Sequence, residues 1–283
     1  MSKEYEEKRG PRGADEHTEK RFPRERRAEE RVPMRERDAE ADGLIEGRNA
    51  VTEALRAGTP IDKIFIARGE TDKTLGHIAS TARAAGVVVV EADRRKLDAM
   101  SQTHAHQGVI ALCAVKEYST IEDMLAIAAE RGEAPFLVLC DEISDPHNLG
   151  AIIRTAECVG AHGVIIPKRR SAGLTAVVDK TSAGALEHMA VARVPNLAAA
   201  IETLKKNGLW IYGTAAEGAN ELWKTDLTGP ACIVIGSEGT GISRLVREKC
   251  DFLVSIPLRG QISSLNASAA AAVLLYEALR QRS

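Results

Sequence analysis

The alternation of apolar and polar residues predicts two successive α/β regions after a charged start. From residue 43 to 115, strand-like runs and helical periodicities follow one another closely. The predicted strands cover residues 63–67, 87–91 and 109–115, and the predicted helices cover 49–57, 72–85 and 94–101. We therefore predict a small N-terminal α/β domain over residues 43–115.

A longer α/β series occupies residues 135–283, and residues 116–134, polar with a helical middle, are predicted to link the two regions. Strands are expected at 136–141, 163–166, 189–194, 210–214, 232–235 and 252–256, and helices at 147–160, 197–206, 243–249 and 265–280. Apolar strands that alternate with helices are typical of a mostly parallel sheet covered on both faces.

Residues 1–42 differ from the rest of the chain in composition. They contain twelve Lys or Arg and thirteen Asp or Glu, with few aliphatic side chains. Such a segment cannot bury enough apolar surface to offset the loss of chain entropy, so we predict a disordered charged tail. A solvated tail and a loose contact with RNA or the ribosome both agree with this composition.

The net charge bears on how the protein can bind RNA, and the cysteines bear on the cellular compartment in which it functions. The net charge of −2 means that RNA binding has to depend on local basic patches. The five cysteines are scattered without close pairs, which favours reduced thiols in a cytoplasmic protein. We recognise neither a signal peptide nor an apolar run suited to a membrane span, so a cytoplasmic location without a membrane partner is expected.

Three late strands are followed by loops suited to ligand binding. The loops begin near Thr214, Gly236 and Ile256, and the third continues to Leu265. Ligands of parallel sheets bind where the strands end, so a composite pocket from these loops is expected. The glycines of the middle loop read G-x-x-G-x-G, which differs from the G-x-G-x-x-G of dinucleotide sites, and a P-loop is absent.

The segment from Asp145 to Arg154 carries the clearest chemical pattern. Pro146 should break the preceding structure, and Asn148 is placed to cap the helix that follows. Small residues beside Arg154 leave its side chain room to reach a partner. A salt bridge to a nearby glutamate is the ordinary alternative for a helical arginine.

Three segments together resemble the signature motifs of the SpoU-type (TrmH-type) branch of the SPOUT RNA methyltransferases. They are N-x-x-x-x-x-R from Asn148, I-G-S-E-G-x-G-I-S from Ile235, and I-P-L-x-G-x-x-S-S-L-N-x-S from Ile256, in the family's order. Upstream, residues 45–51 and 106–109 resemble the substrate-binding domain of the bacterial 23S rRNA guanosine 2′-O-methyltransferases. The resemblance covers everything from about Gly43 onward.

This resemblance implies a fold, a cofactor and an assembly. The fold is a C-terminal parallel sheet with a trefoil knot, preceded by a small α/β substrate-binding domain of the L30e-like type. The cofactor is S-adenosylmethionine, and the assembly is a homodimer. The positions that match the family's cofactor-binding residues are Thr214, Gly236, Ile256 and Leu265.

The resemblance also implies the catalytic residues. Arg154 matches the catalytic arginine, and the surrounding positions are Asn148, Glu238, Ser264 and Asn266. Because a guanidinium is effectively always protonated in proteins, we favour stabilisation of the developing alkoxide or an adjacent phosphate over proton abstraction by Arg154. A desolvated, deprotonated Arg154 is the alternative. Glu238 is expected to orient Arg154 or to hydrogen-bond within its loop, and Ser264 and Asn266 can also cap the last helix.

Further expectations concern metal and surface contacts. No metal site is expected, since His104 and His106 lack a partner cluster. The run Lys168, Arg169 and Arg170 is a candidate phosphate-contacting patch, with a solvated turn as the alternative. On the last helix one side carries Ala267, Ala270, Ala271 and Leu274, which suggests a surface for the dimer.

The expected function is therefore S-adenosylmethionine-dependent 2′-O-methylation of a guanosine ribose in 23S rRNA, in the peptidyl-transferase region, on rRNA or a ribosomal assembly intermediate. A tRNA guanosine 2′-O-methyltransferase and a non-catalytic RNA-binding assembly factor are the alternatives, with a nucleotide-dependent oxidoreductase a distant third. The separate N-terminal domain favours ribosomal RNA.

Overall fold

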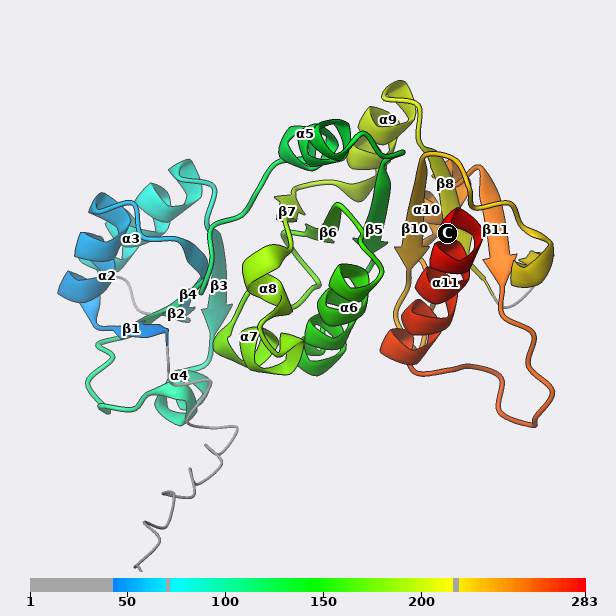
Figure 1. Ribbon diagram of the computed structural model, residues 1–283. Helices are drawn as coiled ribbons and strands as arrows, with labels where there is room; N and C mark the ends of the chain where they lie inside the picture. Colours follow the sequence, from blue (N-terminus) through cyan, green and yellow to red (C-terminus); the bar gives the residue numbers. More distant parts are fainter. Residues whose placement is uncertain (1–42, 70–71, 216–218) are drawn as a thin grey trace, which may run out of the picture. The chain divides into compact units, whose positions relative to one another are not determined.

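The computed structural model describes residues 43–69, 72–215 and 219–283 (Figure 1). The predicted disordered tail over residues 1–42 lies outside these ranges. The described residues form two sheets, of four and seven strands, and each sheet has helices on both faces. No described helix is both long and apolar enough to cross a membrane.

The N-terminal sheet has the order β1-β4-β2-β3, with β2 and β3 parallel and the other two pairs antiparallel. Its elements are β1 (Leu44–Glu46), α2 (Arg48–Arg56), β2 (Ile61–Ala67), α3 (Lys73–Ala84), β3 (Val88–Ala92), α4 (Arg94–Met100) and β4 (Val109–Cys113). Successive residues of β2 point to opposite faces. Ile64 therefore packs with α2 and α3, while Phe65 packs with Leu97 of α4.

The C-terminal sheet has the order β7-β6-β5-β10-β8-β11-β9, and all its strand pairs are parallel. Its strands are β5 (Phe136–Cys140), β6 (Gly163–Pro167), β7 (Val191–Val194), β8 (Trp210–Thr214), β9 (Asn220–Glu221), β10 (Ala231–Ile235) and β11 (Phe252–Ser255). The predicted mostly parallel sheet is thus confirmed. Parallel strands are hydrogen-bonded and covered on both faces, which explains their continuous apolar sequences.

Helices cover both faces of this second sheet. One face carries α6 (Pro146–Cys158), α7 (Ala176–Ser182), α8 (Ala185–His188) and α11 (Ala267–Arg282). The other carries α5 (Ile121–Arg131), α9 (Leu197–Lys206) and α10 (Arg244–Lys249). The strands β1 and β9, the helices α7 and α8 and the short 3₁₀ helix η1 (Leu222–Lys224) were not predicted. All of these except α7 have only two to four residues, which leaves little periodicity to detect.

The segment predicted to be a linker contributes to the core of the second sheet. Helix α5 begins with a capping box in which Thr120 and Asp123 each bond the other's backbone amide. Its Met124 is fully buried and packs so closely against Gly163 that a Cβ at this glycine would force the Met124 side chain to move. This helix therefore belongs structurally with residues 135–283.

The start of α6 differs from the prediction. Its N-cap is Asp145, whose carboxylate accepts a hydrogen bond from the His147 amide at 2.9 Å. Pro146 occupies the first helical position, where its missing N–H costs nothing. The prediction that Asn148 caps this helix is wrong, because the cap forms three residues earlier and the Asn148 amide is free to bond elsewhere.

The last helix bears on two expectations. Asn266 caps α11 as predicted, since its Oδ1 accepts from the amides of Ser268 and Ala269. Ala267, Ala271 and Leu274, however, are buried at 4, 0 and 2% exposure within the chain's own core. These three residues pack α11 against α6 and the sheet, while Ala270 is half-buried and lines a cavity, so the expectation of a dimer built partly on this helix stays a prediction.

Candidate active site

Three loops meet at one edge of the second sheet. Strands β10, β8 and β11 are neighbours and run parallel, so their carboxyl ends lie side by side. The loops that follow them line a cavity of about 520 Å³, a typical ligand-site volume. All four predicted cofactor-binding residues line it: Thr214, Gly236, Ile256 and Leu265. The topology thus assembles the pocket that the loop chemistry suggested.

The loop after β10 folds back tightly on itself. Ser237 and Gly241 exchange backbone hydrogen bonds of 3.1 and 2.9 Å, and the hydroxyls of Ser237 and Thr240 lie 2.8 Å apart. A Cβ on Gly236 would come within 2.6 Å of the Gly241 carbonyl oxygen. Only glycine is therefore compatible with this turn, which places backbone rather than side chains along the cavity.

Asp141, at the end of β5, holds the far end of this loop. Its carboxylate is buried at 3% exposure and accepts a hydrogen bond of 2.6 Å from the Ser243 amide. Ser243 is the N-cap of α10, so this bond ties the loop to the neighbouring strand. Sequence reasoning missed Asp141, although an acidic residue directly after a buried apolar strand was a usable signal.

Asn148, Glu238 and Asn266 form a hydrogen-bonded cluster beside the cavity. The side-chain Nδ2 of Asn148 donates to Glu238 Oε1 at 2.9 Å. The side-chain Nδ2 of Asn266 donates to the same oxygen at 2.5 Å and to Asn148 Oδ1 at 2.9 Å. The three residues are 28 to 118 positions apart in sequence. Glu238 Oε2 accepts no hydrogen bond from the residues described, so it can face a bound molecule.

Ser264 and Arg154 are placed differently. Ser264 lines the cavity, next to Leu265. Arg154 lies on α6 with an exposed side chain that forms no hydrogen bond or ion pair with any residue the structure describes, Glu238 included. It does not line the cavity. The arrangement thus unites four of the five predicted catalytic positions and leaves the guanidinium pointing into solvent.

The cavity walls suit S-adenosylmethionine. Ile235, Val254, Ile256 and Leu258 provide apolar surface for an adenine ring, and the glycine-rich turn offers backbone groups for its polar edge. Among the lining residues, Glu238 and Arg247 carry charge, one of each sign. A ligand that combines a sulfonium with an amino acid group matches both charges.

Nearby thiols do not offer an alternative nucleophile. Burial raises the pKa of the Cys140 thiol, at the end of β5, to about 12. A thiol needs a lowered pKa to react as thiolate, so Cys140 acts as a small apolar core residue. Among the described residues no group of three or more His, Cys, Asp or Glu could hold a metal ion.

The basic run Lys168, Arg169 and Arg170, which follows β6, has partners for some of its side chains. Arg170 pairs with Glu142 at 3.0 Å while its side chain stays 81% exposed. Lys168 donates to the Gly86 carbonyl at 3.4 Å. Arg169 is exposed. The run thus presents positive charge at the carboxyl end of β6, with one carboxylate beside it.

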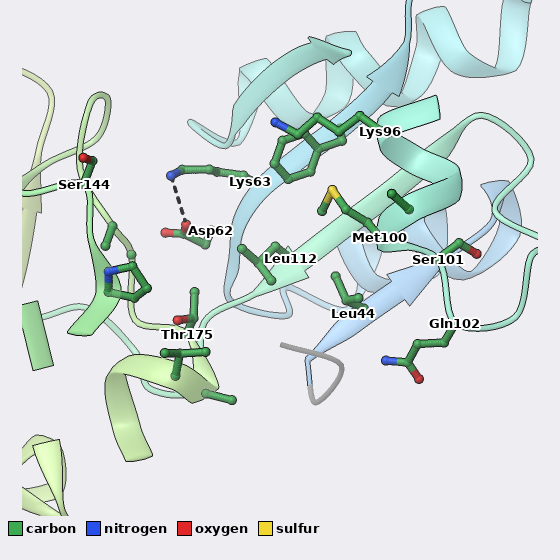
Figure 2. A pocket seen from close by; sticks show the side chains of 17 residues that line it. Leu44, Asp62, Lys63, Lys96, Met100, Ser101, Gln102, Leu112, Ser144 and Thr175 are labelled. Carbon is green, nitrogen blue, oxygen red and sulfur yellow. Dashed lines mark ion pairs between the residues drawn. The ribbon is translucent and has the colours of Figure 1, made fainter. Parts of the chain in front are cut away.

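A second cavity, of about 790 Å³, is lined by Asp62 and Lys63 of β2, by α4, and by residues at the starts of α6 and α7 (Figure 2). The buried Asp62 accepts hydrogen bonds at Oδ1 from Tyr118, at 2.8 Å, and from Arg193. Burial raises the pKa of Tyr118, so its hydroxyl stays protonated as the donor. Arg193 also lies over the Tyr118 ring at 4.4 Å. These contacts satisfy Oδ1 of the buried carboxylate, while Oδ2 has no hydrogen-bond partner among the described residues and lies 4.0 Å from Lys63 Nζ.

Comparison with known families agrees with this geometry. Residues 135–276 match the SpoU rRNA Methylase family, and residues 44–119 match the RNA 2′-O ribose methyltransferase substrate binding family. The first match covers the seven-stranded sheet with its three loops, and the second covers the four-stranded sheet. This chain belongs to the SpoU rRNA methylase family.

Relatives and solved structures extend the match. The Bacillus subtilis protein YacO, placed by its name in the TrmH family of tRNA/rRNA methyltransferases, is 46% identical over 236 residues, 83% of this chain and 94% of YacO. A Staphylococcus aureus relative of the same family is 45% identical, over 85% of this chain and 97% of its own. The SpoU methyltransferase AviRb from Streptomyces viridochromogenes, solved with the cofactor AdoMet, is 29% identical with a TM-score of 0.53, over 84% of this chain and 90% of AviRb.

Proposed function

We propose that this protein transfers a methyl group from S-adenosylmethionine to the 2′-hydroxyl of a guanosine ribose in 23S rRNA, in the peptidyl-transferase region. The observation that carries the proposal is the convergence of three sequence-distant motifs on one cavity, with the Asn148–Glu238–Asn266 cluster at its side. The AdoMet complex of AviRb supports the choice of cofactor. The substrate-binding family match supports an RNA ribose as acceptor.

The residues of the chain have distinct roles in this reaction. When bound, S-adenosylmethionine supplies an electrophilic methyl group on a sulfonium. The loops at Thr214, Gly236 and Ile256 would hold this ligand beside the acceptor. The cluster keeps the Glu238 carboxylate oriented, and a negative charge there stabilises a cationic ligand.

Arg154 acts on the acceptor side. Its guanidinium is exposed, so it can bind a phosphate next to the target ribose and stabilise the negative charge that develops at the 2′-oxygen while the hydroxyl proton passes to solvent and the methyl group is transferred, with S-adenosylhomocysteine as the second product. Two parallel N–H donors suit a phosphate well. Arg154 does not line the cofactor cavity, so in this role the bound RNA connects Arg154 with the cofactor.

We also propose the organisation around this site. Residues 43–115 bind RNA, residues 116–134 connect this domain to the second sheet and pack α5 against it, and residues 135–283 hold the catalytic machinery in a knotted sheet of a cytoplasmic homodimer. Since Ala267, Ala271 and Leu274 of α11 are internal, the dimer contact uses other residues. A sedimentation mass equal to one chain at micromolar concentration would contradict the dimer.

The test is a ribose-methylation map of rRNA and tRNA from cells with and without the gene. We expect one 2′-O-methylguanosine of 23S rRNA to disappear, and purified protein with S-adenosylmethionine to restore it. Loss of a tRNA methylation instead would identify the tRNA alternative. No change in either map, with intact binding to ribosomal particles, would favour a non-catalytic assembly factor.

The run Lys168, Arg169 and Arg170 should bind RNA phosphate. Changing all three to glutamine should weaken RNA binding and reduce the slope of log affinity against log salt by roughly 2, since each lost phosphate contact lowers it by about 0.7 to 0.9. The pairing of Arg170 with Glu142 makes its contribution the smallest.

A control changes Lys205 and Lys206 to glutamine. These residues end α9 shortly before β8 begins, so they lie at the edge of the parallel sheet opposite to the carboxyl end of β6. This control should leave the salt slope unchanged. Equal slopes for wild type and the triple variant would show that the run is a solvated turn.

A further inference from the structure

The charged side chains that line the cofactor cavity occupy separate elements. Glu238 lies in the loop after β10, and Arg247 lies in α10. They are the charged residues among those that line the cavity in the described part of the chain; the other lining residues are apolar, glycine or hydroxyl-bearing. The position of the single lining guanidinium is therefore informative about the ligand.

The architecture of α10 places Arg247 at the cavity. Val246 is buried at 3% exposure in the core beneath the sheet, which fixes the rotation of this short helix. The start of α10 is tied to β5 by the bond from the Ser243 amide to Asp141. Arg244, on the same helix, instead lies 91% exposed near Glu248 and does not line the cavity. The two arginines of α10 thus have different surroundings.

The two charges match the two ends of one ligand. S-adenosylmethionine carries a positive sulfonium and ammonium and a negative α-carboxylate. Glu238 can face the positive centre, which leaves the carboxylate for a cation. We infer that Arg247 binds the α-carboxylate of the amino acid moiety of S-adenosylmethionine. The inference rests on the proposed function, because it assigns a role within the same cofactor site.

Arginine is well suited to this role. Its planar guanidinium presents parallel N–H donors that match the two oxygens of a carboxylate. The uncharged lining residues would meet an adenosine with apolar surface, hydroxyls and backbone, which does not distinguish the cofactor from other adenosine thioethers. Arg247 thus makes the cavity specific for ligands that carry the free amino acid.

Calorimetry with two ligands tests this contact. S-adenosylhomocysteine contains the carboxylate, whereas 5′-methylthioadenosine keeps the adenosine and thioether without the amino acid. We expect Arg247→Gln to weaken S-adenosylhomocysteine about 10-fold or more, as for loss of a charged hydrogen bond, and to leave 5′-methylthioadenosine within twofold. Arg247→Lys, which keeps the charge without the fork, should fall between the two.

Arg244→Gln is the matched control on the same helix and should leave both ligands unchanged. Equal weakening of both ligands by Arg247→Gln would assign Arg247 to loop structure and overturn the inference. An unchanged affinity for S-adenosylhomocysteine would overturn it as well, including the case in which RNA binding alone is weakened. If the wild-type protein binds no S-adenosylhomocysteine, the proposed function fails instead.

Discussion

Arg154→Ala should lower the rate of methyl transfer by about 100-fold or more while leaving the affinity for S-adenosylmethionine within a few-fold. The rate falls because a positioned donor to developing negative charge is commonly worth two to three orders of magnitude. Cofactor affinity is retained because Arg154 is exposed on α6 and does not line the cofactor cavity. Single-turnover kinetics and calorimetry measure the two quantities separately.

Arg154→Lys separates charge from geometry. Lysine keeps a positive charge but not the fork that binds a phosphate through two donors, so partial activity is expected. Parallel loss of turnover and cofactor binding in Arg154→Ala would mean that Arg154 maintains the fold. Full activity in Arg154→Ala would remove it from the mechanism and leave the Asn148–Glu238–Asn266 cluster to explain catalysis.

Gly236→Ala should abolish measurable binding of S-adenosylmethionine. The added methyl would press against the backbone of Gly241 and Ile242, and backbone cannot move aside as a flexible side chain can. The turn would have to open, which displaces the groups that line the cavity. Overpacking of this kind typically costs about 1–3 kcal/mol, so a lower melting temperature is also expected.

Gly239→Ala is the matched control within the same loop. A Cβ on Gly239 would meet nothing within 4 Å, and its backbone needs no positive φ. The melting temperature should therefore stay close to wild type, and because Gly239 also lines the cavity, any loss of cofactor affinity should be smaller than for Gly236→Ala. If both alanine variants bind the cofactor normally, the loop is not part of the site; if both fail, the loop needs flexibility rather than the tight turn at Gly236.

The Asn148–Glu238–Asn266 cluster beside the cavity shows which features of the site could be predicted from the sequence and which could not. Asn148, Glu238 and Asn266 were predicted as site residues from the resemblance to the family's motifs, and the structure brings them into one hydrogen-bonded group. Their helix and loop contexts were readable from sequence, as the cap at Asn266 shows. The role of Asn148 could not be predicted in this way, because the same side-chain amide group can cap a helix through its oxygen or bond a distant glutamate through its nitrogen.

The seven-stranded sheet also has features that the sequence predicts and features that it does not. Continuous apolar strands and intervening helices were enough to predict a mostly parallel sheet, because burial on both faces leaves a local signature. Strand order left no such signature. Only the order β10-β8-β11 places the loops after Thr214, Gly236 and Ile256 around one cavity.

Local patterns in the chain therefore sufficed for its longer elements and for the loops that carry the candidate site residues, because these depend on neighbours within a few positions. Three features required the folded chain: the buried Asp141 contact, the internal use of the α11 alanines and the placement of Arg247 at the cavity. Each depends on partners far apart in sequence, and periodicity carries no information about which distant surfaces meet.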